Sequence, residues 1–218
     1  MRLRSAPLWF LLVFCAACSS EADGVSKGEE RLLRASRTGD LKTLTRLLNA
    51  GADIEARNPG DGWTPLMWAG VKGDAATVKY LLSRGSNIEA RDRKGLTPLL
   101  VAGRWGQVKG VAALLDGGAR IEAVDGIGWN ALTWAAFKGQ TEMAAFLLER
   151  GASVDVRDPG GRSPLMLAAM KGHAKIVDML LARGARTTGR DPDGRTAAEL
   201  AEQSGYDDIA RQLRAKAS

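Results

Sequence analysis

The chain has few of the side chains that build catalytic or metal sites. Only 2 cysteines occur among 218 residues, Cys15 and Cys18, and both lie near the N-terminus. His173 is the only histidine. A disulfide framework, a thiolate metal site and a Cys–His or Ser–His catalytic arrangement therefore have almost nothing to draw on after residue 18. We expect no catalytic residue, no metal and no cofactor, and hence no enzyme.

Long apolar runs are also scarce. The run over residues 6–17 has about a dozen residues, whereas a membrane-spanning helix needs about 20. It follows Arg2 and Arg4, and the small residues Ala16 and Ala17 precede Cys18. This pattern predicts an export signal over residues 1–17. An ordinary cleaved signal and a short uncleaved anchor remain as alternatives.

Charge of one sign is in only slight excess. The formal net charge of +6 falls to +4 if Arg2 and Arg4 are removed with the signal. Aspartate and glutamate are interleaved with the basic residues, so the excess is weak evidence for nucleic acid as a partner. The glycines recur as turn and cap residues, which leaves no glycine-rich loop of the kind that holds phosphate.

What the chain does have is a regular spacing of glycines. Residues 39, 73, 106, 139, 172 and 205 are glycines separated by 34, 33, 33, 33 and 33 positions. In the unit that contains Gly73, Thr64 and Pro65 are typical of a helix start, and Gly73 can close that helix in the left-handed conformation. Val78, Leu81 and Leu82 predict a second helix that Gly85 ends. Residues 88–91 are then expected to be extended, before a type I turn over residues 92–95.

This helix–turn–helix unit with a finger-like loop resembles the ankyrin repeat, whose period is about 33 residues. The motifs Thr64-Pro65-Leu66, Thr97-Pro98-Leu99 and Ser163-Pro164-Leu165 carry the resemblance. It implies an all-α repeat solenoid over residues 29–218, with six repeats of which the first and last are polar caps. The repeats are expected at residues 29–57, 58–91, 92–124, 125–157, 158–190 and 191–218.

Two departures from the family pattern concern stability. The histidine that usually follows Thr-Pro-Leu is absent throughout, so packing is expected to carry more of the coupling between repeats. Gly110 lies inside a predicted helix with no turn to explain it, and a glycine there should destabilise the helix by about 1 kcal/mol relative to alanine. Gly110→Ala is therefore expected to stabilise the protein if the position is exposed.

The N-terminal segment resembles the signal of a bacterial lipoprotein. Residues 15–18, Cys-Ala-Ala-Cys, are similar to a lipobox, although the family usually has leucine at the position of Cys15. The resemblance implies acylation of Cys18, which would become the N-terminus of the mature chain. Ser19, rather than aspartate, follows the cysteine, and this implies the outer membrane of a Gram-negative cell, facing the periplasm. Residues 18–28 would then be a short flexible tether.

The carboxylates on successive finger loops suggest a calcium site only at first sight. Glu55, Glu89, Glu122 and Asp155 occupy equivalent positions. Packed helices lie about 8–10 Å apart, whereas calcium ligands lie about 2.3–2.6 Å from the ion. A solvated ladder of charges, paired with arginines two residues further along, is the expected arrangement. His173 is expected to have a structural role in its loop.

Ankyrin-like arrays bind partners on a concave face made by the finger tips and the first helices. Carried onto this chain, the pattern predicts a partner surface that combines large aromatics with basic residues, as interface hot spots do. The expected residues are Trp63, Lys72, Arg93, Lys94, Leu96, Arg104, Trp105, Trp129, Phe137 and Lys138.

The tryptophans are expected to divide between this surface and the core. Trp63, Trp105 and Trp129 should form a stripe on the concave face, whereas Trp68 and Trp134 are assigned to the core. The alternative is that Trp63 and Trp129 only pack against neighbouring fingers. The expected function is a monomeric, membrane-anchored scaffold for a protein or peptide partner that is acidic or bears aromatic residues. A cytoplasmic or host-directed ankyrin protein is the alternative.

Overall fold

A computed structural model describes residues 26–217. Within this range the chain forms helices joined by turns and loops, with no strand. The helices are α1 (Lys27–Thr38), α2 (Leu41–Asn49), α3 (Pro65–Lys72), α4 (Ala75–Ser83), α5 (Pro98–Arg104), α6 (Val108–Asp116), α7 (Ala131–Lys138), α8 (Thr141–Glu149), α9 (Pro164–Met170), α10 (Ala174–Ala182), α11 (Ala197–Gln203) and α12 (Asp207–Ala217).

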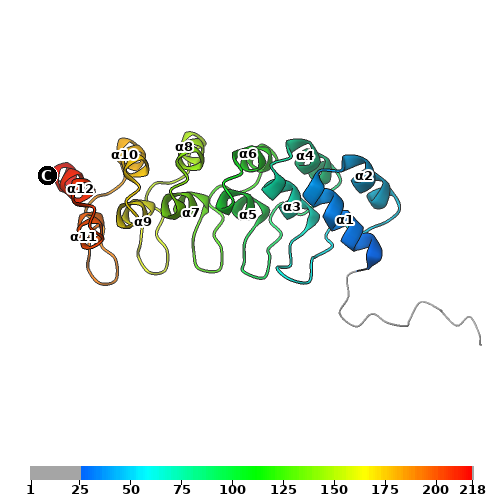
Figure 1. Cartoon of the computed structure of the whole chain (residues 1–218), viewed down its shortest axis with the longest axis horizontal. Helices are drawn as coiled ribbons and strands as arrows, with labels where there is room; N and C mark the ends of the chain where they lie inside the picture. Colours follow the sequence, from blue (N-terminus) through cyan, green and yellow to red (C-terminus); the bar gives the residue numbers. More distant parts are fainter. Residues whose placement is uncertain (1–25, 218) are drawn as a thin grey trace, which may run out of the picture.

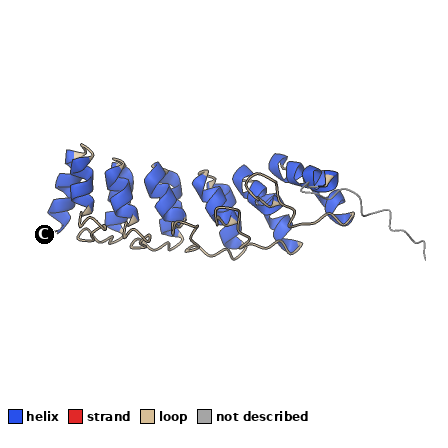
Figure 2. Cartoon of the chain, turned by 90° about the horizontal axis from the view of Figure 1, so that it is seen from below, coloured by secondary structure: helices blue, strands red, loops and turns tan. Residues whose placement is uncertain are grey.

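The helices pair into six units that stack along one axis (Figure 1). The odd-numbered helices form an inner row, the even-numbered helices form an outer row, and a finger loop connects each unit to the next below the inner row (Figure 1). Seen from below, the fingers lie side by side along one edge of the stack (Figure 2). The prediction of an all-α repeat solenoid is confirmed.

The helix boundaries follow from the residues that predicted them. The Thr64 hydroxyl accepts a hydrogen bond from the Met67 N–H, and Pro65 occupies the first helical position of α3. Gly73 closes α3 in the left-handed conformation, with φ of 71°. Asn130 replaces the usual threonine before α7, and its side-chain oxygen still accepts from the Thr133 N–H at 2.9 Å. Local capping therefore sets the length of each inner helix.

One continuous hydrophobic core runs through the stack. Much of it consists of alanines from the inner helices and leucines from both rows. The same inner-helix position is a fully buried alanine in five of the repeats, which lets neighbouring inner helices pack closely. These alanines are Ala69, Ala102, Ala135, Ala168 and Ala201.

Gly110 is not an exposed helix glycine, so the condition on which stabilisation by alanine was expected is not met. It is buried in α6, and a Cβ atom added there would lie 2.1 Å from the carbonyl oxygen of Gly70 in α3. Only a residue without a side chain allows the two backbones to approach this closely.

Two series of side chains connect the finger loops, in addition to apolar packing. Glu55 accepts a hydrogen bond from the Asn87 N–H of the next finger, and Glu89, Glu122 and Asp155 accept from the corresponding N–H groups one repeat further on. Arg57 donates both to Gly62 O in its own finger and to Arg91 O in the next. Each carboxylate therefore bonds to the next repeat and does not pair with the arginine two residues further along the chain. Hydrogen bonds therefore carry part of the coupling between repeats, in addition to the packing that we expected to carry more of it.

Two further expectations differ from the structure. Residues 88–91 are not extended, because Ala90 N–H donates to Asn87 O and closes a turn. Helix α1 begins at Lys27, inside the segment expected to be tether, since Ser26 and Glu29 cap each other reciprocally. The expected signal over residues 1–17, the lipid attachment at Cys18 and most of the tether lie outside the described residues. No helix within residues 26–217 is long and apolar enough to cross a membrane.

Candidate functional site

The candidate binding surface is the concave face, which we define as the exposed side of the inner helices together with the neighbouring finger loops (Figures 1 and 2). Of the ten residues predicted to lie on it, Lys72, Arg93, Lys94, Trp105 and Lys138 are exposed. Arg104 and Phe137 are half-buried. Seven of the ten residues predicted for this surface are therefore at least partly accessible to a partner.

The predicted stripe of three tryptophans is wrong. Trp63 and Trp129 are only 8% and 6% exposed, and Leu96 at the equivalent position is 3% exposed. Each indole turns toward the next finger, where Trp63 Nε1 donates to Asp92 Oδ2 at 3.0 Å and Trp129 Nε1 donates to Asp158 Oδ2 at 2.9 Å. A buried indole N–H needs such an acceptor. Both tryptophans therefore join consecutive repeats and are unavailable to a partner.

Trp105 is the exception, since 61% of it is exposed. It follows directly after α5, near the middle of the inner row. Its side chain makes no hydrogen bond or ring contact within the part of the chain that the structure describes. Ile127 on a finger is 55% exposed. Large apolar side chains left exposed on a solenoid face are typical of contact points for another protein.

A basic residue lies at the C-terminal end of each of the first five inner helices. Repeats one to five each place one cation within two residues of the glycine that closes the inner helix. We call this set the basic row: Arg37, Lys72, Arg104, Lys138 and Lys171. Helices α3, α5, α7 and α9 contain no aspartate or glutamate at all. No member of the row takes part in the nine ion pairs found within residues 26–217.

Aromatic rings hold part of this row in place. The Arg104 guanidinium lies 4.5 Å from the ring centroid of Trp134, and the Lys171 ammonium lies 4.9 Å from that of Phe137. Trp134 is buried, as expected, with Trp129 and Leu167 around it. Cation–π contacts leave the charge itself free to meet an anion.

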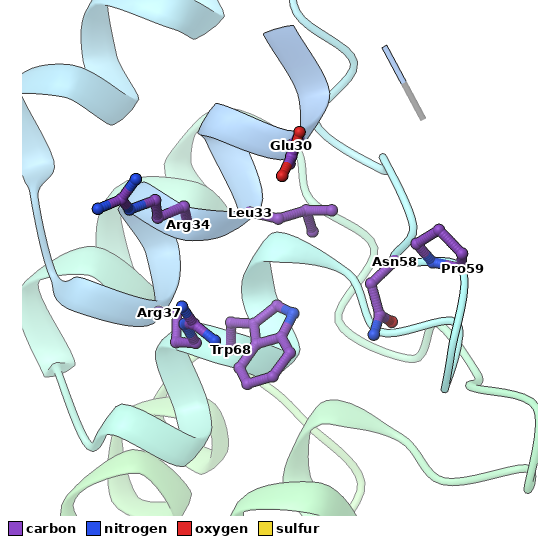
Figure 3. Close-up of a pocket in the computed structure, with 7 residues that line it drawn as sticks. All are labelled: Glu30, Leu33, Arg34, Arg37, Asn58, Pro59 and Trp68. Carbon is purple, nitrogen blue, oxygen red and sulfur yellow. The ribbon is translucent and has the colours of Figure 1, made fainter. Parts of the chain in front are cut away.

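A cavity of about 400 Å³ opens at the N-terminal end of the concave face. Its lining residues come from α1, α3 and the first finger, and Figure 3 shows them: Glu30, Leu33, Arg34, Arg37, Asn58, Pro59 and Trp68. Trp68 is half-buried and packs against the core, so its assignment to the core holds only in part. From the first repeat, the guanidinium of Arg37 lies over this ring, 5.7 Å from its centroid.

Sequence reasoning missed Arg37 and Trp68 as site residues. Arg37 lies two positions before Gly39, as Arg104 lies two before Gly106, so extending the register into the atypical first repeat finds it. Trp68 and Trp134 share one register, and a tryptophan five residues earlier packs against each of them. Their burial differs because Phe137 also contacts Trp134, whereas the equivalent position beside Trp68 is Val71.

The finger tips are rigid supports for this face. Arg93 and Lys94 project from a turn fixed by Asp92, whose Oδ1 accepts from the Lys94 N–H at 2.8 Å. In a later finger, Asp158 is buried. Burial raises the pKa of its carboxyl, but the hydrogen bonds from Trp129 and Arg162 outweigh this effect and hold the pKa below its ordinary value of 3.8. Asp158 is therefore a structural anion.

The finger carboxylates and His173 do not form a metal site. No group of three or more histidine, cysteine, aspartate or glutamate side chains within residues 26–217 is placed to hold an ion. His173 packs over Gly139, and its Nε2 lies 3.3 Å from Phe137 O, which joins two repeats.

The fold and the face together define a helical repeat protein built to present one extended surface. Comparison with protein families identifies which kind. The family described as "Ankyrin repeats (3 copies)" matches residues 32–125, and the family described as "Ankyrin repeats (many copies)" matches residues 132–181. The chain belongs to the ankyrin repeat family, whose repeats mediate binding to protein partners. Comparison with curated proteins finds no match.

Proposed function

We propose that this protein is a membrane-anchored scaffold that binds another protein through its concave face and carries out no catalysis. The observation that carries the binding part is Trp105, a large apolar side chain 61% exposed beside the basic row. The core does not use its indole, whereas Trp63 and Trp129 in neighbouring repeats are buried. A buried aromatic anchor at the centre of an interface commonly contributes about 2 kcal/mol or more to binding.

The anchoring part of the proposal comes from the sequence. Export and acylation of Cys18 are supported by Arg2 and Arg4, by the apolar run that follows them and by the lipobox-like residues 15–18. The tether before Lys27 is short, so an acylated array would stay close to the membrane surface. Ser19, rather than aspartate, follows Cys18, so the location that we propose is the outer membrane of a Gram-negative cell, facing the periplasm.

Capture from detergent-solubilised membranes tests the binding part. Residues 26–218 are immobilised as the original array and as the Trp105→Ala variant, and retained proteins are identified by mass spectrometry. We expect at least one protein that the original array retains and the variant does not. If every retained protein binds both arrays equally, the concave face is not the binding surface.

Intact-mass measurement of the mature protein tests the anchor. We expect a chain that begins at Cys18 and carries acyl groups, and we expect Cys18→Ala to prevent this processing. A mature chain with an unmodified Cys18 would contradict the lipid anchor and leave the binding proposal untouched.

A further inference from the structure

The cations of the basic row form no ion pair within residues 26–217. Other arginines pair with acids, as Arg120 does with Glu89 at 3.2 Å, or donate to finger carbonyl oxygens, as Arg57 does. Row members meet aromatic rings or solvent, and four consecutive inner helices beside them contain no acid. Unpaired like charges along one face repel each other and lower stability. An anionic partner would remove that repulsion.

The spacing of the row limits the shape of that partner. Each repeat contributes one cation, and packed helices are separated by about 8–10 Å. An extended polyproline II segment advances about 3.1 Å per residue and returns to the same face every third residue, which is about 9 Å. Carboxylates at every third position of such a segment would therefore meet successive members of the row.

The cavity at one end of the row has a different chemistry. Trp68 and Leu33 supply apolar surface, and the charged residues Glu30, Arg34 and Arg37 surround it (Figure 3). An aliphatic side chain in the cavity would bury apolar area against the indole. The cavity volume of about 400 Å³ is ample for one such side chain.

We infer that the concave face binds an extended acidic polypeptide segment, with carboxylates at every third residue along the basic row and an apolar side chain at one end in the Trp68 cavity. This inference rests on the proposed protein-binding function and specifies the chemistry of its partner. A protein segment fits better than a lipid surface, because finger loops project beside the inner helices whose ends carry the row (Figure 1). It fits better than nucleic acid, because the apolar surface of Leu33 and Trp68 in the cavity suits an aliphatic side chain, which nucleic acid does not carry.

Fluorescence anisotropy with labelled synthetic peptides tests the inference on residues 26–218. The probe has about thirteen residues, with glutamate at every third position, proline between them and leucine at one end. A second peptide has the same composition with its glutamates consecutive, and a third ends in glycine instead of leucine. We expect the spaced peptide to bind at least fivefold more tightly than the clustered one, and the leucine to improve binding at least threefold.

Charge reversal on the array supplies the matched controls. Lys138→Glu in the row should weaken binding of the spaced peptide at least tenfold, and this loss of affinity should be smaller at high salt. Lys175→Glu on α10 makes the same change in net charge on an exposed site of the outer row, and should change binding less than threefold. Trp68→Ala should remove the advantage of leucine over glycine, once its melting curve shows a folded array.

Several results would overturn the inference. Equal binding of the spaced and clustered peptides would do so, as would equal losses from Lys138→Glu and Lys175→Glu. Tighter row-dependent binding to anionic vesicles or to single-stranded oligonucleotides would assign the row to another partner. A captured protein that depends on Trp105 but is not displaced by the spaced peptide would contradict the inference and leave the proposed function standing.

Discussion

Gly110 of α6 packs directly against the backbone of Gly70 in α3. A Cβ on Gly110 would lie 2.1 Å from the Gly70 carbonyl oxygen and 2.9 Å from its carbonyl carbon. No side chain fits that space without moving one helix relative to the other. The third repeat therefore sits against the second at a distance that only glycine permits.

Gly110→Ala should destabilise the array, by about 1–3 kcal/mol as overpacked cores usually do. Urea unfolding followed by circular dichroism measures the change. Gly28→Ala is the matched control, since Gly28 is also in a helix but has nothing closer than Ser26 Oγ at 3.8 Å. That variant should be as stable as the original or slightly more stable. A more stable Gly110→Ala protein would show that the two helices can separate freely.

Val124 interrupts the series of arginines that joins the fingers. Arg91 donates to Gly95 O in its own finger and to Val124 O in the next, and Arg157 makes the equivalent pair of bonds one repeat beyond the interruption. Val124→Arg should restore the bonds between the third and fourth repeats and stabilise the array by about 0.5–1.5 kcal/mol. The midpoint of urea unfolding checks this. A midpoint that does not rise would mean that the series adds no stability.

The stability of the array should fall in acid because of buried aspartates such as Asp158. Its pKa is lower in the folded state than in the unfolded chain, so the folded state binds the ionised form preferentially. That contribution is complete above the unfolded pKa of about 3.9 and disappears as the pH falls through the lower folded value.

Asp158→Asn isolates this contribution. The variant should melt at a lower temperature near neutral pH, yet lose less of its melting temperature between about pH 5 and pH 3 than the original protein. Scanning calorimetry at several pH values measures both. Parallel curves for the two proteins would rule out Asp158 as a source of the acid sensitivity.

The sequence predicts the fold almost completely, because the residues that start and stop each helix act locally. Thr64, Pro65 and Gly73 define α3 without help from the rest of the chain. The site is harder to predict, because burial of a side chain depends on the next repeat. Trp63 looks available until Asp92, in the following finger, is seen to accept its indole N–H. Gly110 could not be recognised as a contact glycine without the position of Gly70.

The central claim is that Trp105 belongs to a binding surface and has no part in the fold. Its most direct test measures the melting temperature and the dissociation constant for a captured partner on the same purified Trp105→Ala protein. Trp63→Ala is the matched control, since it removes an indole that is 8% exposed and bonded to Asp92. It should melt many degrees lower. We predict that Trp105→Ala keeps its melting temperature and loses at least tenfold in affinity. A Trp105→Ala protein that melts several degrees lower but binds its partner normally would contradict the account.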